Sequence, residues 1–409
     1  MGHRARPGHR QAAGPADDDR CRGPADRPLQ PAAMSGAAEP AVVATIDLAA
    51  IRHNVALLRQ RAGGAAVMVV VKADGYGHGA AECARAALQA GAREVGVATI
   101  DEALALRRAG IRAPILAWLH ASDAQFRAAL EADIALGVSS LAQARAVRAI
   151  AATLGRPVRV DLKLDTGLAR NGAQAEQWAP IMRELAAAER EGGLRVHGLF
   201  SHLARADEPL HPLIDEQAAR FRQGVALARR LGLAPTANHL ANSAAALTRP
   251  DLAFDLVRAG IASYGLSPIP QLGDLGLRPA LSLGARIALT KRIGAGDGVS
   301  YGHAWTAERA GTVALVPMGY ADGLPRALSG RFSVRIGGRR YPAVGRICMD
   351  QFLVDLGDNP DGIQAGETAT LLGPSALDGT LQGWADELGT ISYELATLLR
   401  GRTARAYAG

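Results

Sequence analysis

Three features of the sequence predict an α/β fold: eight short apolar runs, segments of helical periodicity between them, and, after about residue 275, a change to alternating runs separated by glycine turns. Eight strand–helix units in succession predict a parallel (β/α)8 barrel of the TIM type over residues 41–275, with its active site at the carboxyl ends of the strands. An open doubly wound sheet is the structural alternative. The expected strands are 66–71, 94–98, 114–118, 133–138, 157–163, 194–201, 236–240 and 254–259.

A helix is predicted ahead of the first of these strands. Leu48, Ile51, Val55 and Leu58 recur at helical spacing behind Asp47, a residue type that favours the N-cap. The first strand of residues 41–275 is expected to belong either to the barrel or to the C-terminal domain.

Residues 276–409 are predicted to form a mostly antiparallel β-domain, because alternating apolar runs are separated by glycine turns. One clear helix is expected near 381–389. A hairpin is expected around Gly337 and Gly338, which separate two alternating runs.

Residues 1–40 are predicted to be a disordered extension, because they are rich in Arg, Pro, Gly and Ala and carry few bulky apolar side chains. The segment that begins at Met34 is similar to an ordinary start. A hypothesis is therefore that residues 1–33 come from an upstream start codon.

Composition narrows the class of protein. The net charge of +7 comes from arginines scattered among acidic residues, with few aromatic residues, which argues against a nucleic-acid partner. Cys21, Cys83 and Cys348 have no metal-ligand spacing, so no metal site and a cytoplasmic location are expected. The apolar run 65–71 is far too short to span a membrane, and no signal peptide is recognisable.

Lysine is rare in this chain. Only three of 46 basic residues are lysines, namely Lys72, Lys163 and Lys291. A lysine amine can form a Schiff base with an aldehyde, whereas arginine stays protonated. Lys72 ends the first barrel strand and is followed by glycines at 75, 77 and 79, which are expected to let the backbone approach a bulky cofactor. The alternative is a solvent-exposed lysine beside a glycine turn.

The segment 69–79 (VVVKADGYGHG) resembles the pyridoxal-phosphate attachment motif of the alanine racemase family, and the resemblance continues in the same order from about residue 41 to 400. Two departures are the Asp74-Gly75 pair, where many relatives have Asn-Ala, and the C-terminus, which lacks the usual Val-Pro and leaves the last residues unplaced. The other matching segments are 163–172 (KLDTGLARNG), Ser201-His202, 239–245 (HLANSAA), 258–261 (RAGI), 299–302 (VSYG), 319–323 (GYADG), 348–351 (CMDQ) and Tyr393-Glu394.

The resemblance implies a racemase with two bases. Lys72 would hold pyridoxal phosphate as a Schiff base and act on one face of the substrate α-carbon, and Tyr301 would act on the other face. A tyrosine, with an ordinary pKa of about 10, needs neighbours that favour its anion, and His202 and Arg258 are the expected ones. Arg258 would also face the pyridine nitrogen and keep it unprotonated.

The resemblance also implies the binding groups. The phosphate would be bound by Tyr76, Ser243 and Tyr393 together with the amides of Gly260 and Ile261, although Asn242 and Ser243 also fit simple helix capping.

The substrate carboxylate would be bound by Arg170 and by the backbone at Met349. Lys163 would be a carbamate that orients Arg170, or else a strand lysine paired with Asp165. The entrance residues would be Tyr320, Arg326 and Arg346, and Lys291 has no expected role.

The expected function is therefore interconversion of L- and D-alanine for peptidoglycan, by a head-to-tail homodimer whose active sites lie at the subunit interface. The alternatives are a racemase for serine, lysine or a broad set of amino acids, a pyridoxal-phosphate-dependent decarboxylase, and a non-catalytic pyridoxal-phosphate carrier. The β-domain argues against a carrier, which has no use for a second base.

Overall fold

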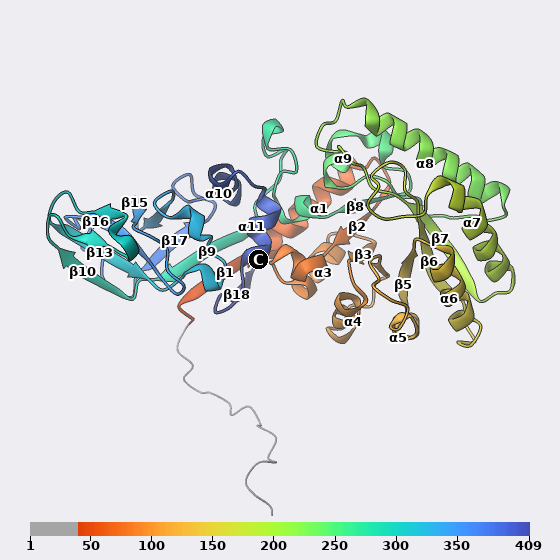
Figure 1. Cartoon of the computed structure of the whole chain (residues 1–409), viewed down its shortest axis with the longest axis horizontal. Coiled ribbons are helices and arrows are strands. Elements are labelled where there is room, and N and C mark those ends of the chain that lie inside the picture. The colour runs from red at the N-terminus through yellow and green to blue at the C-terminus, as the bar shows by residue number, and fades with distance from the viewer. Residues whose placement is uncertain (1–39) are drawn as a thin grey trace, which may run out of the picture. The chain divides into compact units, whose positions relative to one another are not determined.

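The computed structural model describes residues 40–409, whose elements are followed in chain order in Figure 1. The expectations of a disordered extension and of a start at Met34 fall on residues that lie outside this described part.

The predicted barrel is confirmed. Seven parallel strands are hydrogen-bonded in the order β7-β6-β5-β4-β3-β2-β8. Their neighbouring pairs are all parallel, so their carboxyl ends meet at one rim. The strands are β2 (Ala66–Val70), β3 (Glu94–Val97), β4 (Ile115–Ala117), β5 (Ile134–Val138), β6 (Val158–Lys163), β7 (Leu194–Phe200) and β8 (Leu256–Ala259).

The strand expected at 236–240 is not a regular strand. It contributes a single parallel bridge between His239 and Phe200. The amide of Asp255 donates to the carbonyl of Asn238, and the amide of Arg258 donates to that of Ala241, so this segment still closes the ring between β7 and β8. A regular ladder does not form because side chains take part in the pairing: the Asn238 side chain accepts from the Leu199 amide and donates to Asp255.

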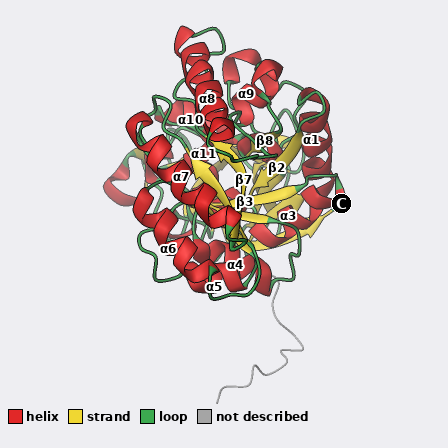
Figure 2. Cartoon of the chain, turned by 90° about the vertical axis from the view of Figure 1, so that its right-hand side faces the viewer, coloured by secondary structure: helices red, strands yellow, loops and turns green. Residues whose placement is uncertain are grey.

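Helices surround the barrel strands, as Figure 2 shows. The helix predicted behind Asp47 is α1 (Leu48–Arg61), and the Asp47 carboxylate caps it by accepting from the amides of Ala49 and Ala50. The others are α2 (Lys72–Tyr76), α3 (Ala80–Gln89), α4 (Ile100–Arg108), α5 (Phe126–Glu131), α6 (Leu141–Ala151), α7 (Ala175–Arg190), α8 (Pro212–Arg230) and α9 (Ser243–Thr248), with 3-10 turns η1 (Pro250–Leu252), η2 (Ile261–Tyr264) and η3 (Pro270–Leu272).

The β-domain contains a nine-stranded sheet in the order β10-β13-β16-β15-β14-β17-β9-β1-β18. Every pairing in this sheet is antiparallel except that of β1 with β18. The prediction of a mostly antiparallel β-domain is therefore confirmed. The sheet strands are β1 (Val42–Asp47), β9 (Leu281–Arg286), β10 (Leu289–Ile293), β13 (Gly311–Val316), β14 (Ser333–Ile336), β15 (Arg339–Val344), β16 (Phe352–Gly357), β17 (Thr368–Leu372) and β18 (Ala404–Ala408). A separate pair is formed by β11 (Gly298–Val299) and β12 (Trp305–Thr306), and 3-10 turns are η4 (Tyr301–His303), η5 (Tyr320–Asp322) and η6 (Arg326–Leu328).

The first and the last strand of the described residues meet in this sheet. The segment that precedes the barrel is β1, which pairs with β9 on one side and with the C-terminal β18 on the other. The last residues, which the sequence left unplaced, therefore form an edge strand. The guanidinium of Arg405 on this strand contacts the segment after β2, at 3.2 Å from the Asp74 carboxylate.

The hairpin at Gly337-Gly338 is confirmed, since Ile336 pairs with Arg339 across a two-residue turn. The expected helix is α10 (Leu381–Leu388), but a second helix, α11 (Ser392–Leu398), follows it. Its seven residues are too few to show a helical period, and its N-cap is the apolar Ile391.

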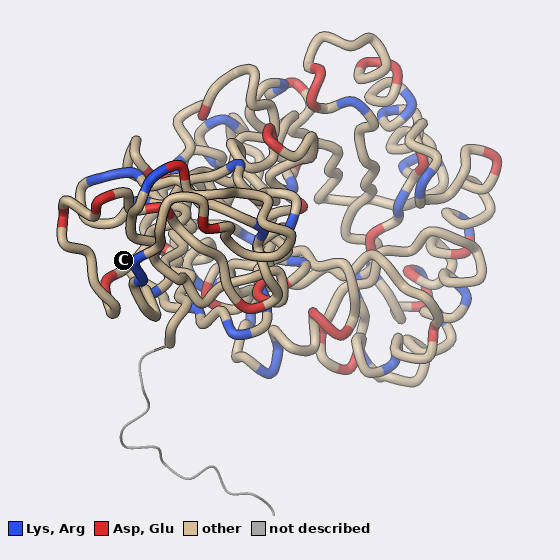
Figure 3. The backbone as a smooth tube through the Cα atoms, turned by 60° about the vertical axis from the view of Figure 1, so that its left-hand side comes forward, with Lys and Arg blue, Asp and Glu red and all other residues tan. Residues whose placement is uncertain are grey.

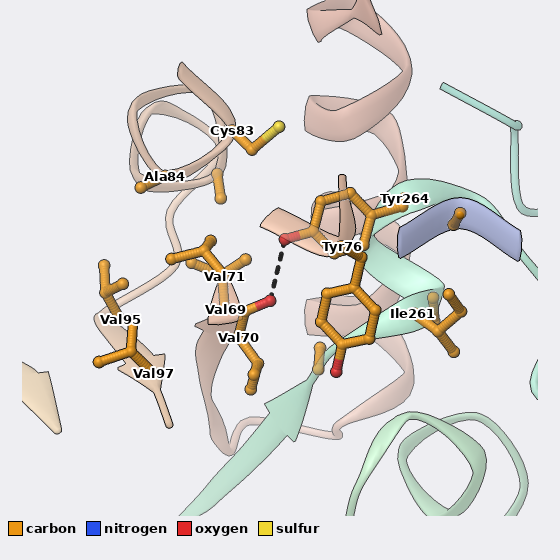
Figure 4. Close-up of a cluster of buried hydrophobic side chains, with 14 of the residues drawn as sticks. Val69, Val70, Val71, Tyr76, Cys83, Ala84, Val95, Val97, Ile261 and Tyr264 are labelled. Carbon is orange, nitrogen blue, oxygen red and sulfur yellow. Dashed lines mark hydrogen bonds between the residues drawn. The ribbon is translucent and has the colours of Figure 1, made fainter. Parts of the chain in front are cut away.

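A continuous apolar core lies beneath the barrel rim. Figure 4 shows Val69, Val70 and Val71 packed with Tyr76 and Tyr264, and the Tyr264 hydroxyl donates to the Val70 carbonyl at 2.9 Å. No helix within residues 40–409 has both the length and the apolarity to cross a membrane. Figure 3 shows basic and acidic residues interspersed along the described chain, as their scatter in the sequence predicts.

Candidate active site

A cavity of about 330 Å³ opens where the barrel strands end. Ten residues singled out from the sequence line it, and they come from the ends of four barrel strands or the turns that follow them and from the first residues of α9 and α11. They are Lys72, Tyr76, Lys163, Arg170, His202, Ser243, Arg258, Gly260, Ile261 and Tyr393.

Sequence reasoning missed two aromatic residues of the lining, Trp118 and Phe200. The centre of the Phe200 ring lies 5.6 Å from the Lys163 amine and 5.6 Å from the Arg258 guanidinium, so the ring makes a cation–π contact with each of these two cations. Both aromatics lie at the carboxyl end of a predicted strand, and that position was the signal that could have identified them.

Lys72 is half-buried and lies two residues after the end of β2. Burial lowers the pKa of its amine, the nearby Arg170 lowers it further, and Glu102 opposes the shift. The amine lies 5.8 Å from the centre of the Tyr76 ring. A lysine amine with a lowered pKa, in a cavity at the barrel rim, is suited to nucleophilic chemistry.

A left-handed turn follows Lys72. Ala73, Asp74 and Tyr76 all have φ of 52°. Such a conformation costs about 1–2 kcal/mol per non-glycine residue, so its neighbours must hold it. The Ala73 amide donates to Glu102 at 2.7 Å, and the Asp74 carboxylate accepts from the amide of Ala80 at 2.9 Å. The turn directs the Tyr76 ring into the cavity.

The glycines of this loop do not approach the cavity as expected. A Cβ atom at Gly77 would lie 2.2 Å from the Ala396 carbonyl oxygen of α11, and one at Gly79 would lie 2.0 Å from the Tyr407 hydroxyl of β18. These glycines therefore admit the C-terminal segments. Gly260 is the glycine that borders the cavity, where a Cβ would lie 2.4 Å from the Tyr76 hydroxyl.

Part of the cavity lining consists of hydroxyl and amide groups. The Ser243 hydroxyl accepts from the amides of Gly260 at 2.9 Å and Ala262 at 3.3 Å, whereas the capping of α9 is performed by Asn242. Burial raises the pKa of Tyr76 and of Tyr393, so both phenols stay protonated and can donate. This arrangement can bind a phosphate group.

Arg258, which is buried on β8, also lines the cavity. Its Nη2 donates to the Ser201 carbonyl at 2.6 Å and approaches the His202 Nδ1 at 3.4 Å. Burial lowers the pKa of Arg258 to about 10, so the guanidinium remains charged at neutral pH. Burial and then Arg258 hold the pKa of His202 well below its usual value, so this imidazole is neutral.

Lys163 ends β6 and is buried. Burial, followed by the charges of Arg258 and Arg170, lowers the pKa of its amine to about 8. The expected alternative of an ion pair with Asp165 is not seen in the described residues, where the Asp165 Oδ1 accepts from three backbone amides of the next turn.

Tyr301, Tyr320 and Met349 lie in the β-domain, and none of them lines the cavity in the described chain. They are 70%, 38% and 53% exposed, which is unusual for large side chains held on ordered segments. Their segments are joined by backbone contacts: the Ser300 hydroxyl donates to the Arg346 carbonyl, and the Tyr320 amide donates to the carbonyl of the residue before Met349.

The remaining sequence-predicted positions are also on the β-domain. Arg326 and Arg346 are exposed, and so is Lys291 on β10. Within residues 40–409, no group of acidic, histidine or cysteine residues could hold a metal ion.

Comparison with known proteins agrees with this arrangement. A family model described as the N-terminal domain of alanine racemase matches residues 46–268, and one for the C-terminal domain matches residues 280–407. The alanine racemase of Mycolicibacterium vanbaalenii is 55% identical over 368 residues, which cover 90% of this chain and 94% of that protein. The alanine racemase of Mycobacterium tuberculosis strain H37Rv is 53% identical, covering 89% and 95%.

Solved structures extend the likeness. The alanine racemase of D-cycloserine-producing Streptomyces lavendulae is 48% identical with a TM-score of 0.87, covering 91% of this chain and 98% of that one. The alanine racemase of Bartonella henselae, solved with covalently bound pyridoxal phosphate, is 29% identical with a TM-score of 0.81, covering 90% and 100%. The chain therefore belongs to the alanine racemase family and is a racemase, an isomerase.

Proposed function

We propose that this enzyme interconverts L- and D-alanine with pyridoxal phosphate, and that it supplies D-alanine for peptidoglycan. The observation that carries the proposal is one cavity that combines a lysine of lowered pKa, a buried arginine and a cluster of hydroxyls and amides.

The residues present fit this cofactor. Tyr76, Ser243, Tyr393 and the amides of Gly260 and Ile261 would hold the phosphate, and the approach of Tyr76 to Gly260 leaves no room for a side chain at residue 260. Lys72 would make the covalent attachment, and Arg258 would donate to the ring nitrogen, because a guanidinium cannot accept. When bound, the cofactor supplies an electron sink that acidifies the α-hydrogen of the substrate.

Two bases are needed, because a proton removed from one face of the α-carbon must be returned to the other. The Lys72 amine would move the proton on one face, since its lowered pKa makes the neutral form available. The Tyr301 hydroxyl would act on the other face, assisted by the neutral His202, whose Nδ1 faces Arg258 and whose Nε2 therefore carries the proton. Arg170 would bind the carboxylate.

Borohydride reduction followed by peptide mapping tests the cofactor attachment, with a racemisation assay on the same preparation. A pyridoxyl adduct on Lys72 and racemisation of L-alanine are expected. An adduct on Lys163 or Lys291 would contradict the proposal.

A homodimer is proposed because Tyr301 and Met349 are exposed and do not line the cavity of their own described chain. A second copy would bring them, with Tyr320, Arg326 and Arg346, to the entrance of the site. Lys72→Ala and Tyr301→Phe, each inactive alone, test this. Random re-association of the two should restore about a quarter of wild-type activity, because each mixed dimer then has one intact site. Absence of recovery would place both bases in one chain.

Lys163 is proposed to carry a carbamate. Its pKa of about 8 leaves part of the amine unprotonated at neutral pH, as reaction with carbon dioxide requires, and the new negative charge would orient Arg170. A carbamate signal from protein equilibrated with ¹³C-bicarbonate, absent in Lys163→Arg, would support this. Initial rates with L-alanine, L-serine and L-lysine distinguish an alanine racemase from a broader one.

A further inference from the structure

A buried hydrogen-bonded chain runs from Arg258 away from the cavity into the barrel interior. Arg258 Nη1 contacts His239 Nδ1 at 3.0 Å, and His239 Nε2 contacts Asp161 Oδ2 at 3.1 Å. The three residues come from β8, the bridging segment and β6, and their exposed fractions are 6%, 0% and 0%. Asp161 and His239 do not line the cavity in the described chain, so neither can touch a ligand there.

The chemistry of these groups sets the position of one proton. A guanidinium only donates, so His239 Nδ1 must accept from Arg258. A neutral imidazole carries one proton, which is then on Nε2 and is donated to Asp161. Burial lowers the pKa of His239 to about 4, although the hydrogen bond to Asp161 opposes this, so the ring is neutral at pH 7.

Asp161 is the acceptor that this arrangement requires. Burial alone would raise the pKa of its carboxyl group, but His197 and His239 hold that pKa well below its ordinary value. The carboxylate also offsets the charge of Arg258 in a region where Lys72, Lys163 and Arg170 are all basic.

We propose that Asp161 is a positioning residue, which acts through the Nε2-protonated form of His239 to orient the Arg258 guanidinium towards the cavity. The inference rests on the proposed function only for what Arg258 faces, the cofactor ring. In the absence of the Asp161 carboxylate, His239 is free to carry its proton on Nδ1, where it would oppose the N–H of Arg258 and turn the guanidinium away.

A matched control lies on the other side of the same carboxylate. His197 approaches Asp161 Oδ1 at 3.5 Å and continues to Glu94 at 3.6 Å, which is paired with Arg159 at 3.1 Å. This branch leads away from Arg258. His197→Gln therefore removes a buried neighbour of Asp161 without interrupting the connection to Arg258.

The first measurement is the tautomer of His239 in the wild-type apoenzyme, from the two imidazole nitrogen shifts of ¹⁵N-histidine-labelled protein, assigned by loss of the signals in His239→Asn. A proton on Nε2 is expected. A proton on Nδ1 would overturn the proposal, whether or not the Asp161 variant folds and whether or not the enzyme uses alanine.

The second measurement compares Asp161→Asn with His197→Gln in the holoenzyme. An asparagine can either donate or accept, so a mixture of His239 tautomers is expected, with a fall in kcat for racemisation of about 10–100-fold and an alanine KM within about threefold of wild type. His197→Gln should keep the tautomer and kcat within about threefold of wild type. Equal losses in both variants, or an unchanged tautomer in Asp161→Asn, would indicate a merely structural role. A wild-type enzyme inactive on alanine would refute the proposed function and leave the tautomer result standing.

Discussion

Buried His78 should lower the stability of the fold at acidic pH, and replacing it with glutamine should remove this one contribution. The imidazole is completely buried against the ring of Tyr264, with ring centres 4.6 Å apart. Its Nδ1 donates to the Tyr76 carbonyl at 2.8 Å, and its buried Nε2 has no hydrogen-bond partner in the described chain. A proton added at Nε2 would place an unpaired charge in an apolar site.

The pKa of His78 determines how the free energy of unfolding changes with pH. Burial, opposed by backbone hydrogen bonds, lowers the pKa of His78 from 6.5 to about 4 in the folded protein. The unfolded chain therefore binds a proton first, and stability that is present above pH 6.5 is lost progressively as the pH falls towards 4. Between pH 7 and pH 5 this one residue should lower the free energy of unfolding by about 2 kcal/mol.

The assay is urea unfolding of wild type and His78→Gln at pH 7, 6 and 5, at one protein concentration. The substitution has its own cost, which is common to all pH values, so only the change with pH is compared. The wild type should lose about 2 kcal/mol more than the variant between pH 7 and pH 5. Parallel pH profiles for the two proteins would refute the reasoning, since His78 would then carry no linked proton.

Three glycine and loop substitutions test the surroundings of the site. Gly77 has φ of 81°, and a Cβ there would lie 2.2 Å from a carbonyl oxygen of α11. Gly77→Ala should therefore lower the free energy of unfolding, measured by urea denaturation, by more than about 1 kcal/mol. An unchanged free energy of unfolding would mean that α11 can move to make room for the methyl group. Gly260→Ala should push Tyr76 aside and weaken binding of pyridoxal phosphate at least about tenfold by fluorescence titration of the apoenzyme, with secondary structure unchanged by circular dichroism. Asp74→Asn keeps the oxygen that accepts from the amide at the start of α3, so stability should stay within about 0.5 kcal/mol; a larger loss would show that its pair with Arg405 matters.

Local patterns predicted most of the fold. Seven of the eight expected barrel strands, the Asp47-capped helix and the Gly337-Gly338 hairpin are present, because periodicity and turn chemistry are properties of neighbouring residues. The pattern was wrong at 236–240, where the Asn238 side chain takes part in the pairing and no regular ladder forms, and it missed α11, which is only seven residues long.

The properties of the candidate site, like those of the fold, could be predicted from the sequence only in part. The available chemical groups could be identified from the sequence, since a lysine at a strand end and the motif around it indicate the family and ten residues of one cavity. The pKa values and orientations of those groups depend on the three-dimensional fold. The pKa of Lys163 and the burial of Arg258 depend on contacts between residues that are distant in sequence. The same holds for the hydrogen-bonded chain from Arg258 through His239 to Asp161, in which His239 and Asp161 are 78 positions apart. Such contacts depend on how the barrel closes and excludes water, and no local pattern encodes that closure.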